Sequence, residues 1–258
     1  MRFLGLDFAG RVPDAKTVWY FRDQLQQRGL VKQLFDRMNS DLERRGIIAN
    51  HGQIVDATFV EAPRQRNSRA DNSTIKAGGV PADWQDNPAR LQQKDTDARW
   101  TKKNKETHYG YKNHVICDSK SKLLTDYKVT DAAVHDSVPL VDLLAGGCAD
   151  GQKLYADSAY RSEAIEESLR DREIESKIHE KAYRNQPLKP VQQKRNTAKS
   201  KVRARVEHIF GFMTQSMGGL TVRGCSLSRN KAVIGLMNIV YNMCRLVQLN
   251  RKIVGSMA

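Results

Sequence analysis

Two aspartates stand within short apolar runs that are typical of β-strands. Asp56 lies in the segment QIVDATFV, residues 53–60, and Asp157 lies in KLYADSAY, residues 153–160. A carboxylate that leaves water loses solvation unless another group compensates it. In a mixed sheet these two strands can be neighbours, and two adjacent carboxylates repel each other until a proton or a cation intervenes. Each aspartate alone fits an ordinary strand-end or turn position, but the pair favours a metal site.

A third carboxylate stands out because of the charges around it. Residues 181–258 contain 15 Lys or Arg and a single acid, Glu207, where the chain average predicts about nine acids. A surface that binds a polyanion excludes carboxylates, so a retained one is a candidate for a specific role. Glu207 lies at the edge of the apolar stripe of a predicted helix, about 100° from Val206. The alternative is an ion pair with Arg203 one turn earlier, although Arg before Glu is the weaker orientation.

These three carboxylates, two on strands and one on a helix, form a ligand set that suits magnesium. This ion prefers oxygen ligands and retains waters that a phosphate can replace. Two such ions a few ångströms apart can activate an attacking oxygen and stabilise a leaving oxygen. The sequence therefore predicts phosphoryl-transfer chemistry at Asp56, Asp157 and Glu207.

The elements that position these residues follow from the patterning of the chain. A strand at 53–60, a hairpin at 108–130 and a later alternation of helices and strands predict an α/β fold, a mixed five-stranded sheet with flanking helices, over residues 51–258. This order matches the ribonuclease H-like fold, while the pattern alone leaves a flavodoxin-like sheet open. Residues 61–107 are almost wholly polar, and we expect a long loop or a partly disordered insertion there.

Residues 1–50 are predicted to form a short helical region ahead of this domain. Two helical segments end at Gly29 and Gly46. Two helices joined at a glycine can form a helix-turn-helix that binds DNA. We favour a pair that packs on the core, because three aromatic side chains require burial: Trp19, Phe21 and Phe35.

Composition limits the class of protein and its partners. The 258 residues carry a formal net charge of +14, which predicts a polyanionic partner, with nucleic acid the first candidate and an anionic membrane the second. The N-terminal segment turns polar too early for a signal peptide, and the most apolar run, residues 232–241, is too short to span a bilayer. The four cysteines lack zinc-binding spacing and fit a reducing cytoplasm.

Five short motifs, in this order, resemble those of one protein family. The motifs IVDATFV, HYGYKNH, VTDAAVHDS, YADSAYRS and RARVEHIFG are similar to segments of bacterial insertion-sequence DDE transposases, which have a ribonuclease H-like catalytic core. The resemblance extends from about residue 4 to residue 248. It implies a DNA transposase that binds terminal inverted repeats, cleaves the transposon ends by metal-assisted hydrolysis and joins the freed 3′ hydroxyl to target DNA.

The resemblance also assigns roles to the carboxylates. Asp56 and Asp157 match the two catalytic aspartates and Glu207 the catalytic glutamate, and all three are implied to be metal ligands. Two Mg²⁺ ions are implied, with Mn²⁺ as a substitute. Arg203, four residues before the glutamate, matches an arginine that is usual in the family.

Seven basic residues are predicted to bind DNA phosphates, a contact that does not depend on base sequence. They are Lys112, Lys194, Arg195, Lys199, Lys201, Arg203 and Arg205. The resemblance implies double-stranded DNA as the partner, both transposon ends and target, a homo-oligomer on that DNA, and a bacterial cytoplasmic location at the nucleoid. Two alternatives stay open: an inactive DNA-binding remnant with a shortened N-terminal region, and a nuclease of the same fold without strand transfer.

Overall fold

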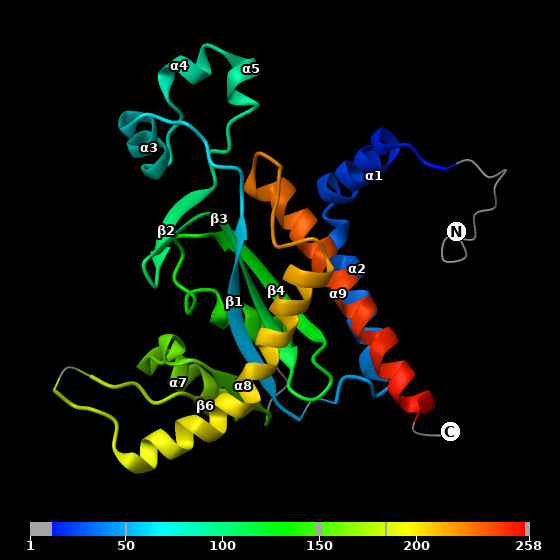
Figure 1. The fold of residues 1–258 in the computed structure, drawn as a ribbon, viewed down its shortest axis with the longest axis vertical. Helices are drawn as coiled ribbons and strands as arrows, with labels where there is room; N and C mark the ends of the chain where they lie inside the picture. The colour runs from blue at the N-terminus through cyan, green and yellow to red at the C-terminus, as the bar shows by residue number, and fades with distance from the viewer. Residues whose placement is uncertain (1–11, 50, 148–150, 184, 256–258) are drawn as a thin grey trace.

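A mixed sheet of six strands forms the centre of the computed structural model, which describes residues 12–49, 51–147, 151–183 and 185–255. The strands are β1 (Gln53–Glu61), β2 (Arg99–Lys103), β3 (Glu106–Asp118), β4 (Leu124–Asp131), β5 (Lys153–Ala156) and β6 (Glu175–Ile178). Their order is β2-β3-β1-β5-β6, and β4 also pairs with β3 (Figure 1). β3 runs antiparallel to β1 and β4, whereas β5 is parallel to β1 and β6. The predicted ribonuclease H-like fold class is confirmed, with one strand more than expected.

β1 and β3 form the longest pairing of the sheet, nine residue pairs in length. Gly110 of β3 adopts φ 143, and a Cβ atom there would lie only 2.4 Å from the carbonyl oxygen of Val60. Only glycine permits this close approach. The predicted hairpin from β3 into β4 is confirmed, and its turn is stabilised by Asp118, which accepts the Ser121 N–H at 2.6 Å.

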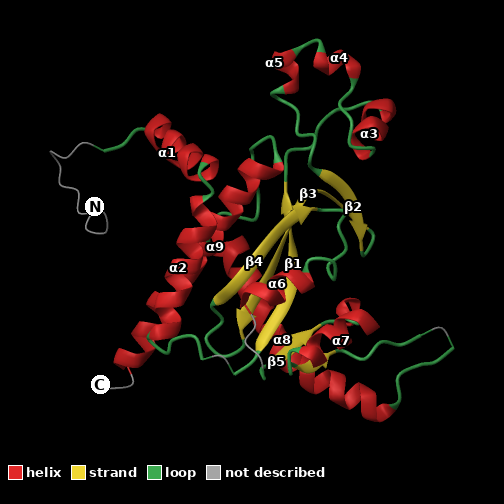
Figure 2. Ribbon diagram, turned by 180° about the vertical axis from the view of Figure 1, so that it is seen from behind, coloured by secondary structure: helices red, strands yellow, loops and turns green. Residues whose placement is uncertain are grey.

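Helices cover both faces of the sheet, and the alternation of side chains along β1 decides which helices each residue contacts. Ile54 and Val60 belong to one apolar cluster with residues of α8 (Pro190–Ser216) and α9 (Leu227–Gly255). Val55 belongs to a second cluster on the other face, with α6 (Leu140–Gly147) and α7 (Glu163–Asp171). Figure 2 shows α6 and α7 over this second face.

Two helices precede the sheet, as the sequence predicts: α1 (Ala15–Gln27) and α2 (Leu30–Arg44). Gly29 joins them at φ 63, a conformation that residues with a side chain rarely adopt. α2 packs on the core through Phe35, whose ring lies edge-on to that of Tyr127 with 4.8 Å between centroids. The predicted burial of Phe35 is therefore confirmed.

α1 differs from α2 because none of its residues is buried. Trp19 and Phe21 are 50% and 64% exposed, so their predicted burial is wrong. The reason is the position of α1, which projects beyond the sheet beside the start of α9, where its aromatic side chains have no core to enter (Figure 1).

The segment expected to be a loop contains regular structure. Residues 61–107 include α3 (Arg69–Lys76), α4 (Ala82–Gln85), α5 (Pro88–Leu91) and β2, the additional strand that the sequence did not predict. The polar composition was misleading, because two buried side chains, Ile75 and Trp84, suffice to anchor short helices whose other faces meet water. Ser68 and Asp71 also form a reciprocal capping box at the start of α3.

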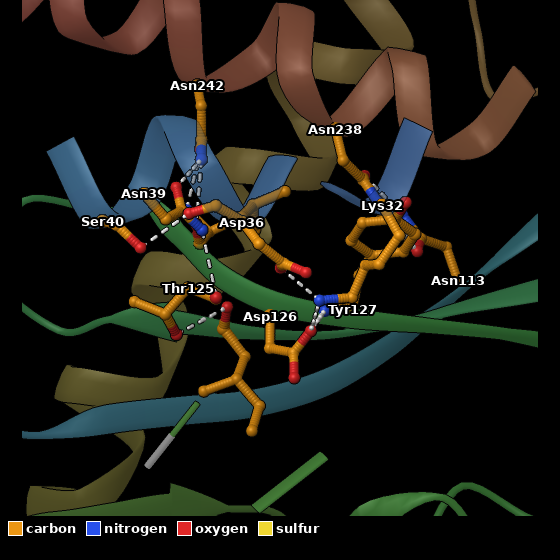
Figure 3. A network of polar contacts seen from close by, with 12 residues as sticks. Lys32, Asp36, Asn39, Ser40, Asn113, Thr125, Asp126, Tyr127, Asn238 and Asn242 are labelled. Atoms are coloured by element: carbon orange, nitrogen blue, oxygen red, sulfur yellow. Dashed lines mark hydrogen bonds and ion pairs between the residues drawn. The ribbon is translucent and has the colours of Figure 1, made fainter. Parts of the chain in front are cut away.

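Within α9, the stretch Leu227–Arg251 is long and apolar enough to cross a membrane by length and composition alone. The apolar run identified in the sequence understated this length. In the structure α9 lies against β4 and α2. Its buried Asn238 hydrogen bonds to Asn113, as Figure 3 shows, and its buried Asn242 accepts a hydrogen bond from the backbone N–H of Leu124. Amide side chains that bond to the sheet are typical of a core helix.

Candidate active site

Asp56 lies in β1, and Asp157 directly follows the last residue of the neighbouring parallel strand β5. Ile54 of β1 pairs with Tyr155 of β5, and each aspartate is two residues further along its strand direction. Because side chains alternate between faces, both carboxylates are on the face where Ile54 and Tyr155 pack, toward α8. The structure thus brings together the two aspartates that the sequence singled out.

Asp56 occupies a weakly solvated position. Its side chain is 16% exposed, and its oxygens accept the Ala57 N–H at 2.8 Å and the Arg203 guanidinium at 2.8 Å. Burial raises the pKa of Asp56 from 3.8 to about 6. The charge of Asp157 adds to the rise, whereas the Ala57 hydrogen bond and the charges of Arg203 and Lys103 oppose it. A carboxylate in this state binds a proton or a cation readily near neutral pH.

Asp157 also has a local structural role. It is the N-cap of η2 (Ser158–Tyr160), a 3₁₀ helix of one turn, and its Oδ1 accepts the Ala159 N–H at 2.7 Å. The turn position considered as the alternative for Asp157 is therefore present. It engages one oxygen, and among the described residues the other oxygen has no hydrogen bond or ion pair. That oxygen is available to a ligand beside Asp56.

Arg203 links Asp56 to Glu207. Its Nη1 donates to Asp56 at 2.8 Å and its Nη2 donates to Glu207 at 3.2 Å. The Arg203 side chain is 23% exposed and that of Glu207 is 62% exposed, so the glutamate lies at the solvent side of the guanidinium. The ion pair considered as the alternative for Glu207 is present, and its role as a metal ligand stays a prediction.

The donor atoms fit a divalent cation at two of the three predicted positions. Asp56 and Asp157 offer carboxylate oxygens, which hard cations prefer, and their charges already repel each other. The described part of the chain contains no group of three or more His, Cys, Asp or Glu side chains placed to hold a metal ion. Glu207 joins such a group only if it exchanges its contact with Arg203 for one toward the two aspartates.

Four of the seven predicted DNA contacts are bonded inside the protein: Lys112, Lys199, Arg203 and Arg205. Lys112 pairs with Asp136 at 2.8 Å, and its side chain is 9% exposed. Lys199 donates to a carbonyl oxygen at the end of β6 at 2.8 Å, and Arg205 donates to a carbonyl oxygen just after β3. Of the seven, Lys112 has the least support as a phosphate contact.

The other three predicted contacts, Lys194, Arg195 and Lys201, are exposed along the first half of α8. Arg195 lies 3.6 Å from Glu180. Lys194 and Lys201 make no ion pair with any residue that the structure describes. These side chains can reach phosphates without first breaking a buried contact.

Sequence analysis did not single out Asp136, an acid whose side chain is mostly shielded from solvent and whose charge, like those of the two aspartates, acts on Tyr160. Asp136, 12% exposed, pairs with Lys112 at 2.8 Å and with Lys103 at 3.4 Å. Burial raises the pKa of Tyr160 well above its ordinary range. The negative charges of Asp56, Asp136 and Asp157 add to this rise. The signal lay in the motif VTDAAVHDS, but Asp136 fits a helix N-cap equally well, and only the fold shows that α6 begins after it.

The sheet order and its flanking helices define the class of this protein, a ribonuclease H-like α/β core, and Asp56 and Asp157 lie at two adjacent parallel strands of that sheet. The particular family is given by the match of residues 50–243 to the family described as the transposase DDE domain. This match covers about three quarters of the chain, which therefore belongs to the transposase DDE domain family.

The solved structures that are similar to this chain include three transposase complexes. The piggyBac transposase synaptic complex with hairpin DNA is 12% identical with a TM-score of 0.48, and the match covers 84% of this chain and 52% of that one. The Mos1 strand transfer complex is 14% identical, with a TM-score of 0.32 and coverage of 97% and 65%. A pre-cleavage Mos1 transpososome is 11% identical, with a TM-score of 0.25 and coverage of 95% and 68%. The chain spans about half the length of the piggyBac transposase chain that it matches.

Proposed function

We propose that this chain is the catalytic core of a DNA transposase that hydrolyses phosphodiester bonds at transposon ends and joins the freed 3′ hydroxyl to target DNA. The observation that carries the proposal is the register of β1 and β5, which sets Asp56 beside Asp157 in a member of the transposase DDE domain family. The net charge of +14 supports double-stranded DNA as the substrate.

DDE transposases generally use divalent metal ions. We assign Asp56 and Asp157 as ligands of Mg²⁺ and Glu207 as the third ligand, reached once it leaves Arg203. When bound, the ion supplies Lewis acidity at the phosphate and lowers the pKa of the attacking water. The backbone N–H groups of Ala57 and Ala159 each fix one oxygen of an aspartate, which limits the rotation of both carboxylates.

Arg203 has a separate role in this proposal. Its charge opposes the rise in the pKa of Asp56 that burial causes, so it favours the ionised carboxylate that a cation requires. Its other nitrogen holds Glu207 at the solvent side of the site. We assign Arg203 as a positioning residue that holds the carboxylates of Asp56 and Glu207 near each other.

α8 connects the proposed chemistry to the proposed DNA contacts. Glu207 and the exposed side chains of Lys194, Arg195 and Lys201 belong to the same helix. A strand whose phosphates follow the first half of α8 is led toward Asp56, which Arg203 contacts at the middle of the helix. The contacts supply affinity and register and do not read the base sequence.

The test is a cleavage assay on DNA that spans the two boundaries flanking the reading frame, with millimolar Mg²⁺ or with EDTA. We expect the parent chain to cleave this DNA only with Mg²⁺. Asp56→Asn and Asp157→Asn should bind the DNA as tightly as the parent and leave it intact. Asp171→Asn, an exposed carboxylate on α7, is the matched control and should cleave normally.

The products decide between this function and its two alternatives. Joined molecules, in which a 3′ end is attached to a second DNA, require strand transfer and exclude a simple nuclease. A parent chain that binds the boundary DNA but cuts it with neither Mg²⁺ nor Mn²⁺ would be an inactive remnant and would contradict the proposal.

A further inference from the structure

A cleft beside the C-terminal end of β1 collects three arginines from segments that are far apart in the sequence. α1 contributes Trp19 and Arg22, the connection before α9 contributes Arg223, and the first turn of α9 contributes Arg229. The cleft has a volume of about 490 Å³, within the roughly 300–1,000 Å³ that ligand sites occupy. Figure 1 shows α1 beside the start of α9, far from β6 and α7. We call this feature the arginine cleft.

The guanidinium groups of the arginine cleft are not neutralised. Arg22, Arg223 and Arg229 are exposed, and none of them forms an ion pair with a carboxylate in the described ranges of the chain. The one acid that lines the cleft, Asp23, accepts a hydrogen bond from Gln27 at 2.6 Å. Three guanidinium groups and one carboxylate leave the cleft with a net positive charge, so an anion that enters is attracted on balance.

The helix terminus beside the cleft does not supply this anion site. Asp97 accepts the Leu227 N–H at 2.7 Å and so occupies the start of α9. Binding of an anion in the cleft therefore depends on the arginine side chains, which substitution can remove without a change to the backbone.

Trp19 adds an aromatic surface to the same cleft. Its side chain is 50% exposed on a helix that has no buried residue. An aromatic face next to a positively charged groove is the combination by which proteins bind single-stranded nucleic acid, because every base can stack on the ring while cations hold the backbone.

We propose that the arginine cleft is a second DNA-binding site, which holds the phosphates of an unpaired strand and stacks one base on Trp19. It rests on the proposed function and adds a site that the basic residues of α8 do not include. An acidic protein segment would meet the same positive charges. The exposed indole favours a nucleotide, because the flat face of a base covers the ring.

The position of the cleft gives the bound strand a role apart from cleavage. The elements that line it, α1 and the start of α9, lie apart from β6, the neighbour of β5 (Figure 1), so DNA held in the cleft is separate from the two aspartates. α1 then contributes to binding through exposed side chains rather than to the core. The aromatic residues of α1 that the sequence predicted to be buried are explained in part, since Trp19 lines this site.

Binding in EDTA tests the cleft without any contribution from cleavage. The probes are a short oligothymidylate and a duplex of the same length, measured by fluorescence anisotropy over a range of salt concentrations. The variant carries Arg22→Gln, Arg223→Gln and Arg229→Gln. The matched control carries Arg37→Gln, Arg69→Gln and Arg170→Gln, three exposed arginines elsewhere, and loses the same net charge.

We expect the cleft variant to lower the slope of log affinity against log salt for the single strand by about 2, at roughly 0.7 per lost contact. The control should lower it by less than 1. Trp19→Ala should weaken single-strand binding about tenfold, and Trp19→Phe should restore most of the affinity because a ring remains. Circular dichroism of every variant should match the parent.

Three outcomes would overturn the inference: an unchanged slope in the cleft variant, an equal fall in both triple variants, or a change in oligomeric size by light scattering in place of weaker DNA binding. The last outcome would identify a contact between protein chains. If the parent chain cleaves DNA and the cleft variant still binds the single strand normally, the inference about the cleft fails and the proposed function stands. A parent that binds neither probe would sink the proposed function as well.

Discussion

Asp56 is the residue at which burial and charge oppose each other most directly. Its carboxylate is 16% exposed and lies beside a second carboxylate, so the ionised form that a metal ligand requires is disfavoured in the metal-free protein. Arg203 and the Ala57 N–H offset only part of this cost, because the pKa of Asp56 still stands at about 6. An ionised Asp56 therefore destabilises the folded protein when no cation is bound.

We expect this residue to make the metal-free protein less stable as the pH rises from about 4 to about 6. The pKa of Asp56 is about 6 in the folded chain against an ordinary 3.8, so the folded state keeps the proton in a window where the unfolded state has lost it. The contribution to stability is complete below the window and lost above it, by at most about 3 kcal/mol at roughly 1.4 kcal/mol per pKa unit.

Urea melts in EDTA at several pH values check this prediction. The difference in unfolding free energy between Asp56→Asn and the parent should grow in favour of the variant across the window, since the amide has no charge to desolvate. A difference that stays constant with pH would contradict the raised pKa.

Replacement of Glu207 should affect stability far less than replacement of Asp56. Its side chain is 62% exposed and pairs with Arg203, and exposed ion pairs contribute about 0–1 kcal/mol. Glu207→Gln should therefore change the unfolding free energy in EDTA by less than about 1 kcal/mol, yet abolish Mg²⁺-dependent cleavage. Glu167→Gln, exposed on α7, should change neither. Cleavage by Glu207→Gln at the parental rate would leave Glu207 with only the Arg203 contact.

At the scale of elements, periodicity predicted the strands but not how they pair. β1, the β3–β4 hairpin, β5 and β6 each have apolar patterns that local residues determine. The pairing of Ile54 with Tyr155, which sets the two aspartates side by side, depends on tertiary contacts that no local pattern specifies. The contact of Arg203 with Asp56 likewise depends on tertiary structure, whereas its ion pair with Glu207 was considered from the helical spacing.

Composition misled the analysis where few residues carry the packing. The segment before β2 is polar, yet Trp84 is fully buried and Arg90 and Lys94 lie over its ring at 5.7 and 4.9 Å. One large side chain beneath cations can hold a short helical segment in place. In α1 the aromatic composition predicted burial that does not occur, because Trp19 and Phe21 have no core to pack against.

Truncation should separate α1 from α2. Removal of residues 1–28 deletes no buried side chain of α1, and we expect the melting temperature to fall by only a few degrees, as for a loss of about 1 kcal/mol. Removal of residues 1–46 also deletes Phe35 and Leu42, which are 0% and 3% exposed, and truncation of one buried Phe alone costs about 3–5 kcal/mol. Melts followed by circular dichroism test both. Equal losses would show that α1 is part of the core.

α9 should depend on its asparagines as much as on its apolar stripe. Asn242 accepts the Leu124 N–H at 2.8 Å and donates to the Leu124 carbonyl at 2.8 Å and to Asn39 at 3.1 Å (Figure 3). Asn242→Ala leaves these buried groups unpaired, and we expect a loss of at least about 1–3 kcal/mol in urea melts. Asn250→Ala, exposed on the same helix, is the control. In a double-mutant cycle Asn39→Ala should cost less in the Asn242→Ala background than in the parent, and additive losses would contradict a shared network.

At the scale of the whole molecule, the excess positive charge is distributed unevenly. Residues 181–205 contain nine Lys or Arg and no acid. The structure divides these cations into side chains bonded within the protein, such as Lys199 and Arg205, and exposed ones on α8, such as Lys194 and Lys201. Formal charge therefore overstates the number of cations that can contact a duplex.

This division predicts unequal effects on duplex binding. The exposed set, Lys194→Gln, Arg195→Gln and Lys201→Gln, should weaken binding to all duplex sequences alike and lower the salt slope by roughly 2 to 3, at about 0.9 per lost phosphate contact. The internally bonded pair, Lys199→Gln and Arg205→Gln, should lower the slope by less than 1 and instead lower the melting temperature, because each substitution removes a donor from a backbone carbonyl. Salt titrations with two unrelated duplexes and thermal melts on the same samples measure both effects. An exposed-set variant with the parental slope would make the first half of α8 an ordinary solvated surface. A large slope change in the internally bonded pair would show that these side chains leave their carbonyl partners when DNA binds.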